Sequence, residues 1–431
     1  MDQSFGAPRG LGGEFTPPPD KSITHRALML AAISSGEGRI LNPLNTGDCL
    51  STRSCLEALG CSFAGAGREL VVRGVGLRGF REPRQILDAE NSGTTTRLLS
   101  GLLAGQPLFA VLSGDASLLG RPMGRVVEPL RKMGARVEGR EGGRYAPLCF
   151  LPGSGWLSPI KWDLPIASAQ VKSCLLLAAL RAEGESRLGG RTVSRDHTER
   201  MLRSLGAAVD AADGAIVVRP VAALPAFTVE IPGDISSAAF FVTAALLSGR
   251  ELEVRGCGLN PRRLGFVNVV RRMGARLIAR EEGESLGEPS GSLLVAPADL
   301  RGTTVAPEEV PDLIDEIPLL AVLGLFAHGV TEVRGAEELR HKESDRLAMV
   351  ARMAESIGGR VELFGDGFAV EGQQRLRTGT VDPAGDHRIA MAAAVAGAGI
   401  RGGVRVKGFE CAKVSYPDFL RDFRALGGEV S

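Results

Sequence analysis

Six segments place small polar residues where an apolar helix is expected to begin. Their markers are Ser22, Ser92, Ser168, Ser236, Asp315 and Asp386. The first N–H groups of a helix are unpaired and its start carries a partial positive charge, so a helix start can bind an anion. A single start of this kind is usually an ordinary N-cap. Six of them in one chain indicate a site for anionic ligands.

Charged residues accompany these helix starts. Lys21 and Arg26 lie at the first of them, and the segment GRPMGR around Arg121 is a basic loop that enters a helix. Asp315 precedes an apolar helix, where an acidic residue is usually a cap. Glu343 lies in RHKESDR, a run of opposed charges that is also typical of a solvated helix face. The five histidines lack the spacing of a metal site, and no Walker A motif is present.

The six helix starts recur with a regular period. Successive markers are 70, 76, 68, 79 and 71 residues apart. A second series keeps the same order, and in it an amphipathic helix ends on an apolar residue followed by glycine. These glycines are Gly60, Gly134, Gly206, Gly274, Gly358 and Gly427. Glycine suits a helix end that needs a left-handed backbone, so we predict six repeats of two helices and about four strands each.

The repeats divide as three plus three. We predict one domain over residues 18–233, holding repeats 1–3, and a second over residues 1–17 plus 234–431, holding repeats 4–6. In this division the N-terminal segment returns to the second half of the chain. Convergence of the helix starts would place the active site in the cleft between the two domains.

Composition excludes several classes of protein. The net charge of +1 and the presence of only two Trp and two Tyr among 431 residues argue against a nucleic-acid binder. The apolar run at 389–400 is shorter than the ~18 residues of a membrane span. No signal peptide is recognisable, and the seven scattered cysteines form no CxxC pair. We therefore expect a cytoplasmic protein with reduced thiols, no membrane contact and no nucleic-acid partner.

Taken together and in order, the motifs resemble those of the EPSP synthase family, the 3-phosphoshikimate 1-carboxyvinyltransferases. The matching segments are KSITHR, NSGTTTR, GRPMGR, SAQVKS, SRDHTERM, PGDISSAAFF, LIDEIPLLAV, LRHKESDRL and DHRIAM. The resemblance covers nearly the whole chain after about Thr16. It implies a two-domain inside-out α/β barrel of the enolpyruvyl transferase type, with six repeats of about 70 residues, three per domain.

The resemblance also implies a reaction. The enolpyruvyl group of phosphoenolpyruvate would be transferred to the 5-hydroxyl of shikimate 3-phosphate with release of phosphate, a step of chorismate and aromatic amino acid biosynthesis. Both substrates are small anions, and the resemblance implies no cofactor, no metal and a monomeric enzyme. The family is the target of glyphosate, and glycine at position 93 goes with sensitivity. Although SAQVKS and SRDHTER resemble a branch in which tolerance is common, we expect inhibition.

Site residues follow from the matching motifs. For shikimate 3-phosphate the resemblance implies Lys21, Ser22, Arg26, Ser168, Ala169, Gln170, Arg195, Asp315 and Lys342. For phosphoenolpyruvate it implies Lys21, Asn91, Gly93, Arg121, Gln170, Arg346, Arg388 and Lys413. It gives catalytic roles to Lys21, Asp315 and Glu343, with Glu343 protonating the enol methylene carbon. Two positions depart from the pattern: Ala169 stands where many members have serine, and Lys413 is one residue out of register with the expected position 414.

Two alternatives share this fold. A UDP-N-acetylglucosamine enolpyruvyl transferase usually carries a reactive cysteine in the loop that corresponds to GRPMGR, whereas Leu118–Val127 contains none. A non-catalytic protein would be expected to have lost one of the two carboxylates, yet Asp315 and Glu343 are both present. A phosphate-release assay with both substrates distinguishes the implied transferase reaction from these two alternatives.

Overall fold

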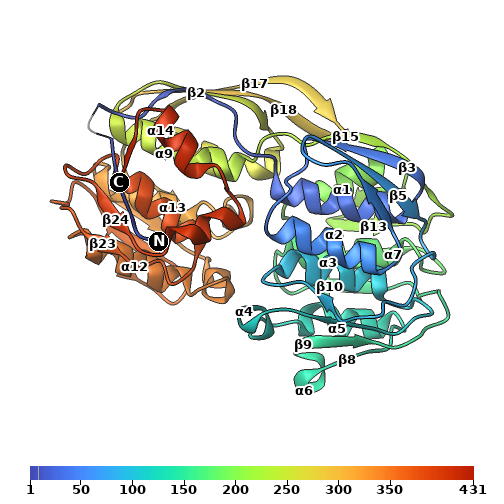
Figure 1. The fold of residues 1–431 in the computed structure, drawn as a ribbon. Coiled ribbons are helices and arrows are strands. Elements are labelled where there is room, and N and C mark those ends of the chain that lie inside the picture. Colours follow the sequence, from blue (N-terminus) through green and yellow to red (C-terminus); the bar gives the residue numbers. More distant parts are fainter. Residues whose placement is uncertain (8) are drawn as a thin grey trace. The chain divides into compact units, whose positions relative to one another are not determined.

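The computed structural model describes residues 1–7 and 9–431. The chain forms two compact units. The N-terminal unit consists of Pro19–Ile231 and Glu284–Glu288, and the C-terminal unit of Met1–Pro18, Pro232–Gly283 and Pro289–Ser431. Figure 1 shows the course of the chain through both units. No helix in the described residues is both long and apolar enough to cross a membrane.

The N-terminal unit contains three small sheets. Its helices are α1 (Lys21–Ile33), α2 (Asp48–Ala58), α3 (Gly93–Leu103), α4 (Ala116–Leu119), α5 (Gly124–Lys132), α6 (Arg140–Gly143), α7 (Ala169–Ala179) and α8 (His197–Ser204). Its strands are β3 (Ser34–Leu41), β4 (Ser62–Ala64), β5 (Glu69–Val75), β6 (Leu87–Asp88), β7 (Ala110–Ser113), β8 (Val137–Gly139), β9 (Tyr145–Phe150), β10 (Lys161–Leu164), β11 (Ser186–Gly190), β12 (Val209–Ala212), β13 (Ala215–Val218), β14 (Leu224–Pro225) and β15 (Thr228–Glu230). The strand orders are β14-β3-β5-β4, with β15 also paired to β3, then β6-β7-β9-β8 and β10-β11-β13-β12.

The C-terminal unit also contains three sheets. Its helices are α9 (Ile235–Ser248), α10 (Gly265–Arg272), α11 (Ile317–Phe326), α12 (Arg346–Ser356), α13 (His387–Ala396) and α14 (Phe419–Ala425), with 3-10 turns η1 (Pro261–Arg263), η2 (Val310–Asp312), η3 (Glu337–His341) and η4 (Phe409–Val414). Its strands are β1 (Gln3–Gly6), β2 (Gly13–Phe15), β16 (Leu252–Gly258), β17 (Arg276–Ser285), β18 (Glu288–Ala296), β19 (Thr304–Val305), β20 (Val330–Val333), β21 (Glu362–Leu363), β22 (Phe368–Glu371), β23 (Thr380–Val381), β24 (Val404–Val406) and β25 (Glu429–Val430). The strand orders are β17-β18-β16-β2, β19-β20-β22-β21 and β23-β24-β1-β25.

All six sheets share one pattern of pairing. In each, an edge strand runs parallel to its neighbour, and that neighbour pairs antiparallel with the next strand. A parallel pair needs a crossover connection, usually a helix. The recurrence confirms the prediction of six repeats of two helices and about four strands, three in each unit.

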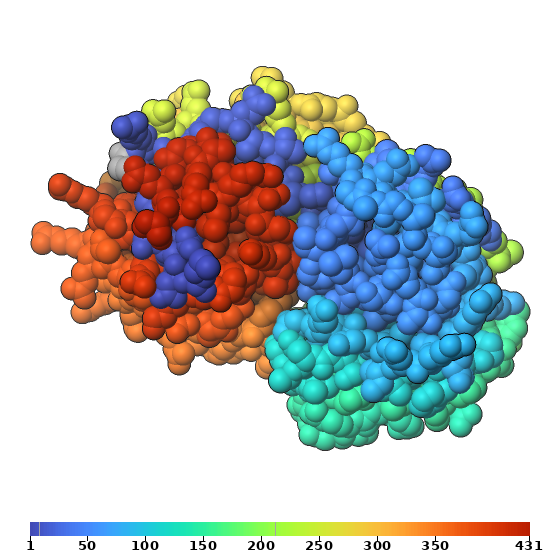
Figure 2. Space-filling view, in the orientation of Figure 1, coloured from blue at the N-terminus to red at the C-terminus, as the bar shows by residue number. Residues whose placement is uncertain are grey.

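The N-terminal residues complete the C-terminal unit. Strand β1 pairs with both β24 and β25, and β2 pairs with β16. In Figure 2 the N-terminal residues (dark blue) accordingly lie among C-terminal segments (red). In the other direction, the turn between β17 and β18 belongs to the N-terminal unit, so the chain leaves the C-terminal unit at Gly283 and re-enters it at Pro289.

The apolar helices form the core of each unit. Helices α1, α3 and α7 pack in sequence in one unit, while α9, α11 and α13 contact one another in the other, and Figure 1 shows strands outside them. These helices lack a polar face along most of their length, which is typical of helices buried on every side. In α13 every residue from His387 to Ala396 is buried. The helices therefore lie inside and the sheets outside.

The six helix-ending glycines all have the predicted left-handed backbone. Their φ angles are 99° at Gly60, 90° at Gly134, 83° at Gly206, 103° at Gly274, 82° at Gly358 and 102° at Gly427. In each case the residue after glycine donates its N–H to a carbonyl five residues earlier, as Cys61 does to Leu56. This is the Schellman bond, which satisfies a helix-end carbonyl. A side chain at these positions would strain the backbone.

A buried histidine links three helices of the N-terminal unit. His25 of α1 is fully buried, and its Nδ1 lies 2.7 Å from Thr52 Oγ1 of α2. That hydroxyl lies 2.7 Å from Thr95 Oγ1 of α3, which donates to Ser92 Oγ at 2.7 Å. Burial lowers the pKa of His25 from 6.5 to about 3, outweighing the nearby carboxylate of Asp48. The imidazole is therefore neutral at physiological pH.

This lowered pKa predicts a loss of stability in acid. The unfolded chain binds a proton at His25 below pH 6.5, whereas the folded chain does so only near pH 3. Stability contributed by the neutral ring is therefore complete above pH 6.5 and falls between pH 6.5 and 3, by roughly 2 kcal/mol at pH 5. His25→Asn should flatten this part of the stability curve in urea titrations at pH 5 and 7. The exposed His328→Asn serves as the control, and equal pH dependence in wild type and His25→Asn would contradict the prediction.

Candidate active site

The first helix start of the N-terminal unit presents Lys21 and Ser22. Asp20 caps α1 by accepting the N–H of Ile23 at 2.8 Å, which leaves the side chains of the first turn available for other contacts. Lys21 Nζ lies 3.2 Å from Asp48 Oδ2, with 16% of the lysine side chain exposed. The local sequence thus builds a capped helix start that carries a partly accessible cation.

Arg26 lies one turn further along α1 and is buried. Its Nε donates to Thr198 Oγ1 at 2.8 Å and its Nη2 to Ser173 Oγ at 2.9 Å. Its Nη1 donates to the carbonyl of Ser22 at 2.9 Å. Burial lowers its pKa to about 10, although the Glu199 carboxylate opposes this effect. Arg26 therefore joins α1, α7 and α8, and its predicted contact with a substrate stays a prediction.

The start of α7 is connected to that of α3. Ser168 caps α7, Ala169 is its first residue, and Gln170 follows. Gln170 Oε1 accepts from Arg97 Nη1 at 2.6 Å, and its Nε2 donates to Thr94 Oγ1 at 2.9 Å. The amide of Gln170 thus fixes the orientation of a guanidinium from the neighbouring helix.

Two arginines flank Gly93 at the start of α3. A Cβ at Gly93 would lie 2.9 Å from Arg97 Nη1 and 3.3 Å from Arg121 Nη1. Arg121 donates to Asn91 Oδ1, and to the Asn91 carbonyl at 3.3 Å. The Asn91 amide in turn donates to Asp115 Oδ2 at 2.6 Å. The absent side chain therefore opens space between two cations and a helix start, an arrangement suited to an anion.

Arg195 lies in the loop between β11 and α8. It is half-buried and precedes α8 by two residues. The hydrogen bonds of Arg26 to α7 and α8, and of Gln170 to α3, join the helices that carry the predicted residues, and Arg195 belongs to the same unit.

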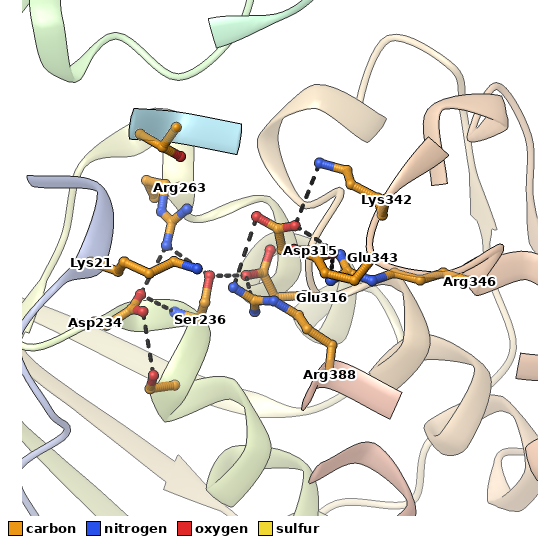
Figure 3. A network of polar contacts seen from close by, with 12 residues as sticks. Lys21, Asp234, Ser236, Arg263, Asp315, Glu316, Lys342, Glu343, Arg346 and Arg388 are labelled. Atoms are coloured by element: carbon orange, nitrogen blue, oxygen red, sulfur yellow. Dashed lines mark hydrogen bonds and ion pairs between the residues drawn. The ribbon is translucent and has the colours of Figure 1, made fainter. Parts of the chain in front are cut away.

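The C-terminal unit gathers carboxylates and cations around Arg346. Arg346 Nη2 lies 2.5 Å from Glu343 Oε2, its Nη1 3.2 Å from Asp315 Oδ1, and its Nε 2.9 Å from Asp386 Oδ2. Figure 3 shows the side chains of Asp315, Glu343 and Arg346 pointing toward one another. Lys342 Nζ lies 3.8 Å from Asp315 Oδ1. Five of the predicted residues therefore converge here, namely Asp315, Lys342, Glu343, Arg346 and Arg388.

Asp386 and Arg346 hold each other ionised. Burial by itself would raise the pKa of Asp386, but the Arg346 guanidinium outweighs it and lowers that pKa below its ordinary value. Burial would likewise lower the pKa of Arg346, but the three carboxylates around it raise that pKa. Asp315 makes no capping bond, because the N-cap of α11 is Glu316 and no side chain caps that helix. Its carboxylate is instead turned to the cations.

Arg388 is held more loosely. Its side chain is 8% exposed, and its nitrogens lie 3.9 Å from Asp315 Oδ2 and 3.9 Å from Glu316 Oε1. Both distances exceed those of a hydrogen bond, which leaves the planar donor face able to bind another anion. Lys413, in contrast, is exposed in η4, and within the described residues the structure gives it no bonded partner. Its predicted place in the site stays a prediction.

The cluster continues from Glu316 to the start of α9. Ser236 Oγ donates to Glu316 Oε1 and accepts from Arg263 Nη2 at 2.7 Å. The same Nη2 donates to Asp234 Oδ1 at 2.9 Å. Figure 3 shows this row of contacts beside the carboxylates. The polar groups at the start of α9 are therefore bonded to other side chains of the protein.

Several residues of these networks were missed by sequence reasoning. Arg97 could have been found, because it lies four residues after Gly93 on the same face of α3. Glu316 also gives a signal, since a charged residue in an apolar run needs a buried partner. Asp48 and Arg263 give none, because their partners are distant in the sequence. Within the described residues no group of three or more His, Cys, Asp or Glu side chains is placed to hold a metal ion.

Comparison with known proteins points to one family. The family model described as EPSP synthase (3-phosphoshikimate 1-carboxyvinyltransferase) matches residues 6–423. The chain is 48% identical to the 3-phosphoshikimate 1-carboxyvinyltransferase of Synechococcus sp. (strain JA-3-3Ab), over 97% of this chain and 95% of the relative. It is also 48% identical to that of Pelotomaculum thermopropionicum, over 97% of each chain. The solved EPSP synthase from Acinetobacter baumannii superposes with a TM-score of 0.88 at 36% identity, covering 100% of both chains.

Proposed function

The chain belongs to the EPSP synthase family, and from this membership we propose that it transfers the enolpyruvyl group of phosphoenolpyruvate to shikimate 3-phosphate. The acceptor is the 5-hydroxyl, and phosphate is released. The observation that carries this function is the cluster in which Asp315 and Glu343 share Arg346, beside Lys342 and Arg388. It combines groups for proton transfer with groups for binding anions.

We assign the proton transfers to the two carboxylates. The 5-oxygen of shikimate 3-phosphate forms a bond to the enol carbon, and its proton passes to Asp315. Glu343 protonates the methylene carbon, which becomes a methyl group. Glu343 then takes back a methyl proton, which restores the double bond as the C–O bond to phosphate breaks, and the leaving phosphate takes the proton held by Asp315. Proton transfer of this kind needs groups within hydrogen-bond reach of the reacting atoms. Arg346 supports the assignment, because it orients both carboxylates.

The binding residues divide by substrate. For shikimate 3-phosphate we propose Lys21, Ser22, Arg26, Ser168, Ala169, Gln170, Arg195, Asp315 and Lys342. For phosphoenolpyruvate we propose Lys21, Asn91, Gly93, Arg121, Gln170, Arg346, Arg388 and Lys413. Both sets draw on residues of both units, so neither unit alone carries the proposed reaction. We further propose that the enzyme acts as a monomer in the cytoplasm, consistent with its seven free cysteines.

A phosphate-release assay tests the function. Purified protein with both substrates should release phosphate and form the enolpyruvyl product, and omission of either substrate should abolish release. Turnover with UDP-N-acetylglucosamine in place of shikimate 3-phosphate would support the sister activity instead. Binding of both substrates without release would indicate a non-catalytic protein.

Gly93→Ala should weaken phosphoenolpyruvate and glyphosate binding. The new Cβ would force apart the ends of Arg97 and Arg121, which are held by other hydrogen bonds. Displaced guanidinium groups lose contacts to the anion, and one hydrogen bond to a charged group contributes roughly 1.5–3 kcal/mol, so KM for phosphoenolpyruvate should rise about tenfold or more. Glyphosate, the longer ligand, should lose more affinity than phosphoenolpyruvate in inhibition assays.

The matched control for this prediction is Gly124→Ala. A Cβ at Gly124 would meet only the Arg144 Cα, at an ordinary 3.9 Å. This variant should keep both affinities. Unchanged inhibition by glyphosate in Gly93→Ala would show that the steric argument does not apply.

A further inference from the structure

Lys172 is a buried lysine that the proposed reaction does not use. It lies in the first turn of α7, two residues after Gln170, and is 1% exposed. The chain contains only seven lysines, so one placed inside the N-terminal unit is unusual. A buried ammonium is costly unless it is paired and hydrogen-bonded.

Three acceptors surround its ammonium. Lys172 Nζ lies 2.7 Å from Glu199 Oε1. It donates to the carbonyl of Thr192 at 3.2 Å and to that of Ser194 at 3.2 Å. An ammonium has three N–H donors, so these contacts use all of them. Two of the three acceptors are backbone atoms of the loop that carries Arg195.

The contact with Ser194 bears directly on Arg195. The Ser194 carbonyl belongs to the peptide unit that joins Ser194 to Arg195, so Lys172 fixes the orientation of the backbone immediately before the arginine. The contact with Glu199 fixes the other end of the loop, because Glu199 lies in the first turn of α8. One side chain therefore ties the loop to α7 on both sides of Arg195.

The first turn of α8 is itself anchored, so the contact of Lys172 with Glu199 can fix the loop that precedes it. Three successive residues there have buried partners from different elements. His197 Nδ1 lies 2.8 Å from Glu288 Oε1, the Thr198 hydroxyl accepts from Arg26 at 2.8 Å, and Glu199 pairs with Lys172. The loop before Arg195 is also held at Thr192, whose hydroxyl donates to the Gly214 carbonyl at 3.4 Å, but the peptide unit that joins Ser194 to Arg195 is held by Lys172.

We propose that Lys172 is a positioning residue that holds Arg195 in the orientation needed to bind shikimate 3-phosphate. This inference rests on the proposed function, which assigns Arg195 to that substrate. Its mechanism is indirect, since Lys172 acts on the backbone and Arg195 contacts the ligand. The competing interpretation is that Lys172 only neutralises Glu199 and contributes to folding alone.

The first test compares the two substrates. Lys172→Met keeps the length of the side chain and removes its charge. This variant should raise KM for shikimate 3-phosphate about tenfold, a size that matches the interaction energies measured between residues of one hydrogen-bond network. It should change KM for phosphoenolpyruvate less than about twofold. An equal rise for both substrates, or no rise, would overturn the inference.

The second test removes the buried charge that the first variant leaves behind. Lys172→Met/Glu199→Gln has no unpaired carboxylate, so its melting temperature should recover towards wild type while KM for shikimate 3-phosphate stays high. Recovery of KM together with stability would show that Lys172 acts only through Glu199. If the single variant fails to fold, the paired variant carries the substrate comparison.

The matched control is Arg181→Met. Arg181 is also a buried cation of the N-terminal unit, but its Nη2 donates to backbone carbonyls at the end of α3, including Leu102 at 3.0 Å. This variant should lose stability and keep the wild-type KM for shikimate 3-phosphate. A rise equal to that of Lys172→Met would mean that any loss of stability raises KM, which would overturn the inference.

The decisive test is a double-mutant cycle with Arg195→Ala. If Lys172 acts through Arg195, Lys172→Met should add almost nothing to KM for shikimate 3-phosphate in the Arg195→Ala background. Full additivity would overturn the inference. An Arg195→Ala variant with unchanged affinity for shikimate 3-phosphate would instead refute the assignment of Arg195 in the proposed function, so the two failures are distinguishable.

Discussion

Glu343→Gln should lower kcat by about 10²–10⁴-fold, the usual contribution of one general acid or base. Glutamine keeps the size of the side chain and can still accept the hydrogen bond from Arg346, which now lies 2.5 Å from the carboxylate. It cannot deliver a proton to the methylene carbon. The fold and both KM values should therefore change little while turnover falls, as measured by steady-state phosphate release.

The control for this variant is Glu337→Gln. Glu337 lies in η3, six residues earlier, and is exposed. Its replacement should leave kcat at the wild-type value. Near-normal turnover in Glu343→Gln itself would remove Glu343 from the mechanism and leave Asp315 as the acid–base candidate of the cluster.

Arg388→Ala should weaken phosphoenolpyruvate binding by about 10²-fold, since a hydrogen bond to a charged group contributes roughly 1.5–3 kcal/mol. The Arg388 guanidinium is nearly buried, yet its neighbouring carboxylates lie 3.9 Å away. Its planar donors therefore match a carboxylate or phosphate better than they match their present partners. Arg121→Ala should act in the same direction. Shikimate 3-phosphate should lose much less affinity in both variants, as measured by calorimetric titration.

Equal losses for the two substrates would mean that these arginines support the structure rather than one ligand. Arg346 is unsuited to the same test. Its removal would leave three carboxylates without their shared counter-charge, and the fully buried Asp386 could not be compensated by solvent. A loss of activity in Arg346→Ala would therefore mix misfolding with weaker binding.

The repeated architecture could be predicted because its signals are local. A cap such as Ser92 acts on an N–H three residues away, and a glycine such as Gly60 ends a helix through its own φ. Such features depend on a few neighbouring residues, so they can be recognised from the sequence. The inside-out arrangement of helices and sheets was implied by the resemblance to the family, and the apolar character of the helices agrees with it. The site residues were likewise named from the resemblance to the motifs of the family, and their roles stay predictions.

The partners of those residues were decided only by the tertiary structure. Arg26 meets Thr198 across 172 positions, and His197 meets Glu288 across 91. Lys172 stands in the motif SAQVKS, but nothing local shows that its ammonium holds the backbone before Arg195. A pairing of this kind depends on how separate helices pack, because the same set of charged and polar residues could pair in many different ways. Local backbone chemistry therefore determined the six helix starts. Packing determined which of the charged side chains there pair with other groups of the protein and which remain suited to bind a substrate.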